Sequence, residues 1–301
     1  MRKENDMATM REGYVDYAGF KTYYRIFGEQ KDNGKLPVVM IHGGPGACHN
    51  YLLPYKVLAD RYDRQVIFYD QIGCGKSSIP PQDDDFWNYD LWLNEFYAVR
   101  DALGLKEFHT FGNSWGGMLE MLIATTDDTG IHSMVLNSSP VRIQTWLDEA
   151  NRLIKYLPED MQEALAEAEA TDNYETPEAI AANDEYYKRH IFGTYPPYPD
   201  YIQETLEGFG DCYLVMQGKS DFVCPGKMRD WDVREDVKNI KVPCMALSGT
   251  DDEGTPYTIK EGVDCIPGCE WVLVPNAVHE THVLAPEICF TAVEEFMERH
   301  E

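Results

Sequence analysis

The chain has 301 residues, of which 44% are hydrophobic and 26% are charged, so it is too apolar for a disordered segment and long enough for one large core or two domains. Acidic residues outnumber basic ones and give a formal net charge of −26. A surface this acidic repels phosphate backbones and anionic lipid headgroups. We therefore expect no nucleic-acid or membrane partner, and a mild preference for cationic substrates.

The first residues of the chain and its cysteines indicate in which cellular compartment the protein is expected. Residues 1–6 include basic side chains, but no apolar run follows them as it would in a secretory signal, and no stretch approaches about 18 apolar residues. The eight cysteines are spread along the chain without a Cys-x-x-Cys pair, so we expect reduced thiols that are mostly buried. These features predict a cytoplasmic protein.

The first predicted element is an antiparallel hairpin over residues 14–17 and 20–27, with Gly19 as its turn residue. Short apolar runs follow, of the kind expected for strands that are covered on both faces. They lie at residues 37–41, 66–69, 108–111, 134–136, 245–247 and 271–274.

Helical patterns alternate with these runs at residues 89–103, 118–126 and 288–297. Alternating strands and helices are typical of an α/β fold with a mostly parallel central sheet, whose ligands bind outside the carboxyl ends of the strands. We expect the functional residues in the loops at that edge.

The alternation stops between about residues 140 and 231, where acidic helical patterns such as 145–157 and 159–170 follow one another. Strands resume at Val242, so an inserted helical cap explains the pattern better than a second independent domain. The predicted organisation is a core in two parts, residues 1–139 and 236–301, with a helical cap over residues 140–235.

Ser114 lies in the segment GNSWGG (residues 112–117), between a predicted strand and a predicted helix. This Gly-x-Ser-x-Gly arrangement is typical of the sharp strand-to-helix turn of the α/β-hydrolase fold, where glycines allow the backbones to approach and the serine is held in a strained conformation. We predict that Ser114 is a nucleophile.

A serine nucleophile needs a histidine base that is oriented by a carboxylate, and in this fold the chain order is serine, acid, histidine. Two loops after predicted strands fit that order. The first holds Asp251 and Asp252, and the second holds His279 and His282. We prefer Asp252 and His279, but the spacing alone leaves both choices open.

A Gly-rich loop, HGGPG (residues 42–46), directly follows the predicted strand 37–41. In this fold such a loop supplies one of the two backbone N–H groups that stabilise a tetrahedral oxyanion, and the residue after the nucleophile supplies the other. We predict Gly44 and Trp115 as the two donors.

Taken together, the motifs resemble those of the proline iminopeptidase (prolyl aminopeptidase) family of α/β-hydrolases, and within it the tricorn-interacting aminopeptidase type. The resemblance spans nearly the whole core. It is carried by HGGPG (42–46), DQIGCGKS (70–77), GNSWGG (112–117) and GTDDEGTP (249–256).

The resemblance implies roles that the spacing leaves open. It selects Asp252 and His279 for the triad, and it implies that Glu253 binds the free N-terminus of the substrate. A second family glutamate comes from a Met-x-Gly-Pro-x-Glu-Phe stretch in the cap, which here reads MQGKSDF (216–222). Asp221 matches that glutamate but is one methylene shorter, and Lys219 replaces the proline, so the preferred first residue can differ from that of the family.

These features predict a serine aminopeptidase of EC class 3.4.11.5 that acts on short peptides or amino-acid amides through an acyl-enzyme, with proline favoured by resemblance and with no metal or other cofactor. The alternatives are a carboxylesterase, lactonase or amino-acid amidase that uses the same triad, and an inactive scaffold. An N-acetylated substrate distinguishes the aminopeptidase from the other hydrolases of this list, since only an aminopeptidase needs the free amine. No oligomeric state is predicted.

Overall fold

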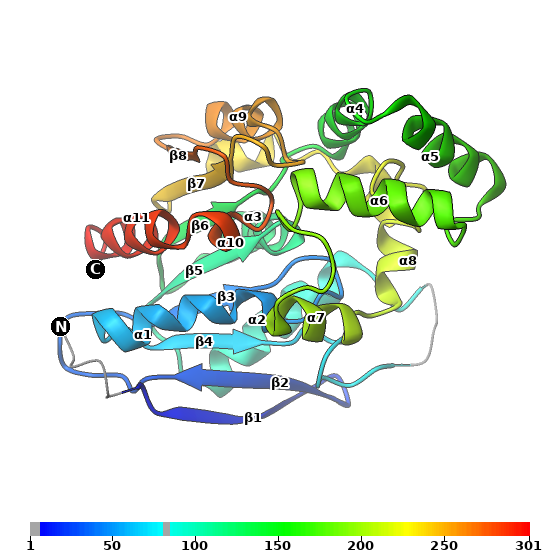
Figure 1. The fold of residues 1–301 in the computed structure, drawn as a ribbon. Coiled ribbons are helices and arrows are strands. Elements are labelled where there is room, and N and C mark those ends of the chain that lie inside the picture. Colours follow the sequence, from blue (N-terminus) through cyan, green and yellow to red (C-terminus); the bar gives the residue numbers. More distant parts are fainter. Residues whose placement is uncertain (1–6, 81–84) are drawn as a thin grey trace.

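The computed structural model describes residues 7–80 and 85–301, and it is built around one eight-stranded sheet (Figure 1). The strand order is β1-β2-β4-β3-β5-β6-β7-β8, and β3 to β8 run parallel. The strands are β1 (Met10–Tyr17), β2 (Phe20–Phe27), β3 (Val38–Ile41), β4 (Val66–Tyr69), β5 (Phe108–Asn113), β6 (Ile131–Asn137), β7 (Cys244–Gly249) and β8 (Glu270–Val274). The prediction of a mostly parallel α/β sheet is confirmed, whereas the expectation about a secretory signal rests on residues 1–6, outside the described residues.

The antiparallel part of the sheet is the predicted hairpin. Strands β1 and β2 pair along their full length, and β2 continues the sheet by pairing with β4. The turn residues Ala18 and Gly19 both have positive φ, at 51° and 84°, which is the backbone that a two-residue hairpin turn requires.

The central strands divide their apolar side chains between two cores. Val39 and Ile67 face one side of the sheet, and Val38 and Phe68 face the other; all four are buried. This alternation explains why the strands appear as unbroken apolar runs in the sequence.

Helices cover both faces of the sheet. The first core includes residues of α2 (Tyr89–Ala102) and α3 (Trp115–Thr126), and the second includes residues of α1 (Val57–Tyr62) and α11 (Pro286–Glu298). The other helical elements outside the five cap helices are η1 (Asn50–Lys56), η2 (Lys227–Asp230), η3 (Asp236–Asn239), α9 (Pro256–Cys265) and α10 (Thr281–Leu284).

Strand β8 departs from the prediction in one respect. It forms at the expected place, but it lies at the edge of the sheet and pairs with β7 alone, so residues 271–273 are only partly covered. The expectation of burial on both faces is therefore wrong here. An apolar run does not reveal whether its strand has one neighbour or two.

Five α-helices lie between β6 and β7 and form the cap beyond the carboxyl ends of the parallel strands (Figure 1). At its base, Ile143 N–H donates to the carbonyl of Trp231, and Val233 N–H donates to that of Val141. The chain thus enters and leaves the cap through a two-stranded neck within residues 140–235. The helices are α4 (Ile143–Ile154), α5 (Glu159–Thr171), α6 (Pro177–His190), α7 (Asp200–Glu207) and α8 (Cys212–Met216).

None of the helices in the described part of the chain combines the length and the apolar character that crossing a bilayer requires.

Candidate active site

Ser114 occupies a sharp turn between β5 and α3. Its φ of 55° and ψ of −121° lie in a region that a serine rarely adopts, and its N–H donates to the carbonyl of Asn137 at 2.8 Å. The flanking glycines make the turn possible, because a Cβ at Gly112 would lie 2.4 Å from the carbonyl carbon of Gly116, and one at Gly116 would lie 2.0 Å from the carbonyl oxygen of Ile41. The turn therefore requires both glycines and exposes the serine at the carboxyl edge of the sheet.

Asp252 and His279 meet at the same edge, on the loops after β7 and β8. The Nδ1 atom of His279 lies 2.9 Å from Oδ1 of Asp252, and both side chains are buried. Asp252 also accepts hydrogen bonds from the Ser138 hydroxyl at 2.5 Å and from the Gly254 N–H at 2.7 Å. Three donors thus fix the carboxylate, and the carboxylate orients the imidazole.

Two opposing effects set the pKa of His279. Burial lowers it, but the Asp252 carboxylate, with contributions from Glu253 and Glu280, outweighs burial and raises the pKa to about 9. The site is therefore built to stabilise an imidazolium, the species that forms when a histidine takes the proton of a serine.

The other two candidates of these loops are placed elsewhere. Asp251 is exposed, and its N–H donates to the carbonyl of Ala277. His282 is buried with Nε2 2.8 Å from the carbonyl oxygen of Tyr51, and burial lowers its pKa to about 4. The structure thus brings Asp252 to His279, but neither Asp251 nor His282 joins that pair.

Gly44 and Trp115 line a recess of about 50 Å³ together with Ser114. Gly44 has a φ of 109°, and a Cβ there would lie 2.4 Å from the nitrogen of Gly46, so only glycine fits. Trp115 opens α3, where the first N–H groups have no partner within the helix. Within residues 7–80 and 85–301, neither of these backbone N–H groups makes a hydrogen bond.

Two side-chain hydrogen bonds in series hold the Gly-rich loop against α3. The Trp115 indole donates to Oε1 of Gln71 at 2.8 Å, and Nε2 of Gln71 donates to the carbonyl of His42 at 2.8 Å. Because all three residues are buried, the relative position of the two backbone donors is set by a rigid network.

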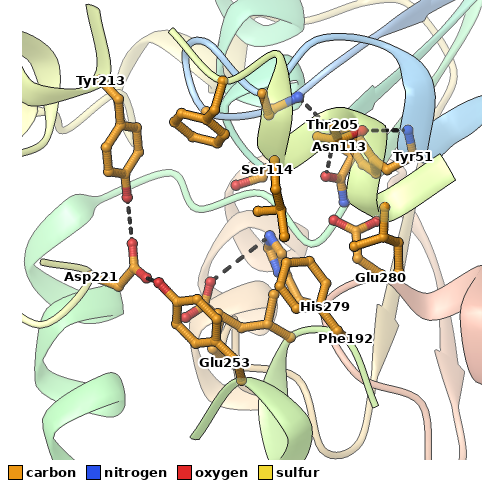
Figure 2. A pocket seen from close by; sticks show the side chains of 18 residues that line it. Tyr51, Asn113, Ser114, Phe192, Thr205, Tyr213, Asp221, Glu253, His279 and Glu280 are labelled. Carbon is orange, nitrogen blue, oxygen red and sulfur yellow. Dashed lines mark hydrogen bonds and ion pairs between the residues drawn. The ribbon is translucent and has the colours of Figure 1, made fainter. Parts of the chain in front are cut away.

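A cavity of about 260 Å³ lies between core and cap, and Ser114 and His279 are in its wall (Figure 2). The core supplies Gly43 and Gly44 of the Gly-rich loop, Tyr51 of η1 and the residues beside the predicted triad, and the cap supplies the rest of the wall. Among the described residues, no lysine or arginine lines this cavity, and no group of three histidine, cysteine, aspartate or glutamate side chains could hold a metal ion.

The two acids predicted to bind an N-terminus, Asp221 and Glu253, line both the cavity and the recess beside Ser114. Asp221, from the cap, accepts hydrogen bonds from the Tyr187 hydroxyl at 2.7 Å and from the Tyr213 hydroxyl (Figure 2). The two phenols hold the shorter aspartate in place from the cap side.

Glu253 belongs to the core, on the loop after β7 that also carries Asp252. Its Oε1 lies 4.0 Å from Nε2 of His279, and its buried Oε2 has no partner among the described residues. Burial raises its pKa well above the usual range. A buried carboxyl that lacks a donor is a suitable partner for a ligand that brings one.

Carbonyl groups at the end of α6 connect the cap to the loops after β7 and β8. The carbonyl of His190 accepts the N–H of His279 at 2.9 Å and that of Glu253 at 3.2 Å, and the carbonyl of Ile191 accepts the N–H of Glu280 at 3.0 Å. The loops after β7 and β8 are thus bonded to the cap as well as to the core.

Several residues of the site were missed by sequence analysis. Glu280 lines the cavity directly after His279, and this adjacency was a signal that it could face the same space. Ser138 follows β6 at the carboxyl edge, where polar residues are expected to be functional. Tyr187 and Tyr213 belong to the cap and carry no comparable sequence signal.

Comparison with known proteins agrees with this geometry. The family model described as alpha/beta hydrolase fold matches residues 37–286, so the chain is a member of that fold family. Proline iminopeptidases of Lactobacillus crispatus and Lacticaseibacillus rhamnosus are 34% and 40% identical to it, over 96% and 90% of this chain and 99% and 92% of theirs. The chain therefore belongs to the proline iminopeptidase family, as the motifs predicted.

Solved structures support the same relationship over the whole fold. The proline iminopeptidase of Mycobacterium smegmatis is 32% identical with a TM-score of 0.90, covering 96% of this chain and 98% of its own. The crystal structure of VinJ is 33% identical with a TM-score of 0.92, covering 97% and 99%.

Proposed function

We propose that this protein is a serine aminopeptidase that releases an N-terminal residue, with proline preferred, from short peptides or amino-acid amides. The observation that carries the proposal is the pair of carboxyls, Asp221 and Glu253, in the wall of the recess that also contains Ser114. Relatives of this chain that are 34% to 40% identical are named proline iminopeptidases, which supports the same activity.

In the proposed reaction, the Ser114 hydroxyl attacks the carbonyl carbon of the first residue while His279 takes its proton. Asp252 accepts the Nδ1–H of His279 and stabilises the imidazolium. The N–H groups of Gly44 and Trp115 bind the oxyanion. The imidazolium then protonates the leaving amine, and water, activated by the same histidine, releases the acyl group from Ser114.

The two carboxyls explain why a free N-terminus would be required. Each can accept a charge-assisted hydrogen bond from an ammonium, and an acylated nitrogen offers neither the charge nor enough donors. A prolyl N-terminus is a secondary ammonium with two N–H groups, one for each acid. Its ring fits the apolar lining of the recess, which includes Met118, Ile143 and Trp146.

We further propose that residues 140–235 act as the cap of the active site, since this segment supplies Asp221, and that the enzyme works in the cytoplasm on peptides with a free N-terminus. The eight cysteines, all within the described residues, are free thiols there, as suits a reducing compartment.

Hydrolysis of prolyl 4-nitroanilide and its N-acetylated analogue tests the proposal. We expect the free-amine substrate to be cleaved and the acetylated one to be nearly inert, with proline preferred in a panel of aminoacyl arylamides. Equal rates on both substrates would favour an esterase-like or amidase-like enzyme instead, and no cleavage of any arylamide would contradict the proposed function.

A further inference from the structure

Glu280 is a third acidic residue in the cavity wall, beside Asp221 and Glu253, and the proposed mechanism does not use it. The residue is only 6% exposed, it lines the cavity, and its buried Oε2 atom has no hydrogen-bond partner among the described residues. Burial raises its pKa to about 8, as expected for a carboxyl without a firm cationic partner.

Among the described residues, neither neighbouring histidine donates a hydrogen bond to the Oε2 atom of this acid. His282 has Nδ1 3.9 Å from Oε2 of Glu280, but its Nε2 faces the Tyr51 carbonyl, which can only accept, so Nε2 carries the proton of the neutral ring. Since burial lowers the pKa of His282 to about 4, this ring is uncharged at neutral pH. The nitrogens of His279 face Asp252 and Glu253.

Glu280 also lies on the other side of the nucleophile from Asp221, one of the two acids proposed to bind the ammonium. The recess that contains Asp221, Glu253 and Ser114 does not include Glu280. In Figure 2, Asp221 and Tyr213 lie on one side of Ser114, whereas Glu280 lies on the other.

This placement assigns Glu280 to one part of the substrate. If the N-terminal ammonium is bound at Asp221 and Glu253, the acyl carbon lies at Ser114, and the residue after the scissile bond extends to the opposite side. The wall there includes Ile202, Thr205 and Leu206 of α7, so methylene groups can pack on it while a charged end reaches the acid.

We propose that Glu280 is a specificity residue for the leaving group and that it favours substrates whose second residue carries an aliphatic cation, such as lysine. The inference rests on the proposed aminopeptidase function and names a further feature of its substrate. Three carboxyls and no lysine or arginine in the wall of the described cavity suit a substrate with two positive charges.

The test compares Pro-Lys-NH₂ with Pro-norleucine-NH₂, which lacks only the side-chain ammonium, in assays above the pKa of Glu280. We expect wild-type kcat/KM to be about tenfold higher for the lysine substrate, the order of one charge-assisted hydrogen bond. In Glu280→Gln this ratio should fall close to one. A third substrate, Pro-Glu-NH₂, should be the poorest in the wild type and improve in the variant.

A matched control separates a local contact from the general acidity of the protein. Glu207→Gln removes the same charge from an exposed position of α7 that does not line the cavity, so the lysine preference should persist. The ratio is read within each variant, so a change in overall rate does not obscure it.

The outcomes are distinct. A wild-type ratio near one, or a lysine preference that persists in Glu280→Gln, would overturn the inference while leaving the aminopeptidase proposal intact. Failure to cleave any prolyl amide would instead overturn the proposed function. Should Glu280→Gln not fold, Glu280→Asp is the second variant; its retracted carboxylate should reduce the ratio, and an unchanged ratio would count against the inference.

Discussion

The core and the cap build the cavity in different ways. Ser114, Asp252 and His279 come from core loops at strand ends, and backbone groups and buried polar side chains fix their positions. The cap contributes Asp221, which the hydroxyls of Tyr187 and Tyr213 hold in place.

The comparison separates two kinds of information. The parts expected to perform the chemistry depend on backbone geometry and thus on glycine-rich motifs, whereas the part expected to select the substrate depends on side-chain contacts between helices. Reaction type is therefore easier to predict from the sequence than substrate preference. The predictions below test this division, beginning with the largest effect.

Ser114→Ala should abolish the hydrolytic activity, because the core residue Ser114 is the proposed nucleophile. Without the nucleophile we expect kcat/KM for prolyl 4-nitroanilide to fall by about 10⁴-fold or more, and labelling by a serine-reactive fluorophosphonate to disappear. Circular dichroism checks that the variant is folded. A residual rate within tenfold of the wild type would mean that another group performs the attack.

Asp252→Asn should reduce kcat by about 10³- to 10⁴-fold, because an amide neither stabilises the imidazolium nor enforces the same tautomer of His279. Asp251→Asn is the matched control. Its side chain is exposed, so the variant should stay close to wild-type activity in the same arylamide assay. Similar losses in both variants would refute the assignment of Asp252 as the triad acid.

Asp221→Asn tests the cap. Loss of one charge-assisted contact to the ammonium should reduce kcat/KM by about 10- to 100-fold, mainly through a higher KM. Asp221→Glu, which restores the family residue, should remain active but change the order of preferred first residues in an arylamide panel. If neither substitution changes selectivity, Asp221 does not bind the N-terminus.

Tyr213→Phe should have a smaller effect, since it removes one of the two phenols that hold Asp221. We expect KM to rise by about three- to tenfold, the order of one lost hydrogen bond, with kcat little changed. Tyr187→Phe should behave alike. Tyr257→Phe, at a residue that is 71% exposed, is the control and should match the wild type.

The smallest expected effect concerns pH. Burial lowers the pKa of His279, but Asp252 and neighbouring carboxylates raise it to about 9. The base works only when neutral, so kcat/KM should rise with pH up to that value. Glu253→Gln removes a carboxyl 4.0 Å from Nε2 and should shift the rise to lower pH. A shift in the opposite direction would contradict this account.

Much of the fold could be predicted because strands and helices have their own periodicities. Six strands form where the apolar runs lie and two form the predicted hairpin, although β1 begins at Met10, earlier than expected; the glycines around Ser114 indicate the turn on which it lies. The exposure of β8 was not predictable, because the sequence of a single strand does not determine its position in the sheet.

The site was predictable only in part, and the limits are physical. Spacing could not choose between Asp251 and Asp252, since a loop can turn either carboxylate inwards, and only the family resemblance resolved it. Tyr187 and Tyr213 reach Asp221 from different cap helices, so their contacts depend on tertiary packing. The sequence shows Glu280 next to His279, but it does not show that the side chain of Glu280 faces the cavity.

The carbonyl of His190 has a consequence for how such enzymes can be redesigned. It belongs to the cap, yet it accepts the N–H groups of both His279 and Glu253. A graft that replaces the cap with a shorter lid, or with one from another hydrolase, would leave those donors without their acceptor and loosen the loops after β7 and β8. The cap and the loops after β7 and β8 therefore depend on each other structurally, and new specificities are better sought by exchanging side chains within this cap than by exchanging the cap itself.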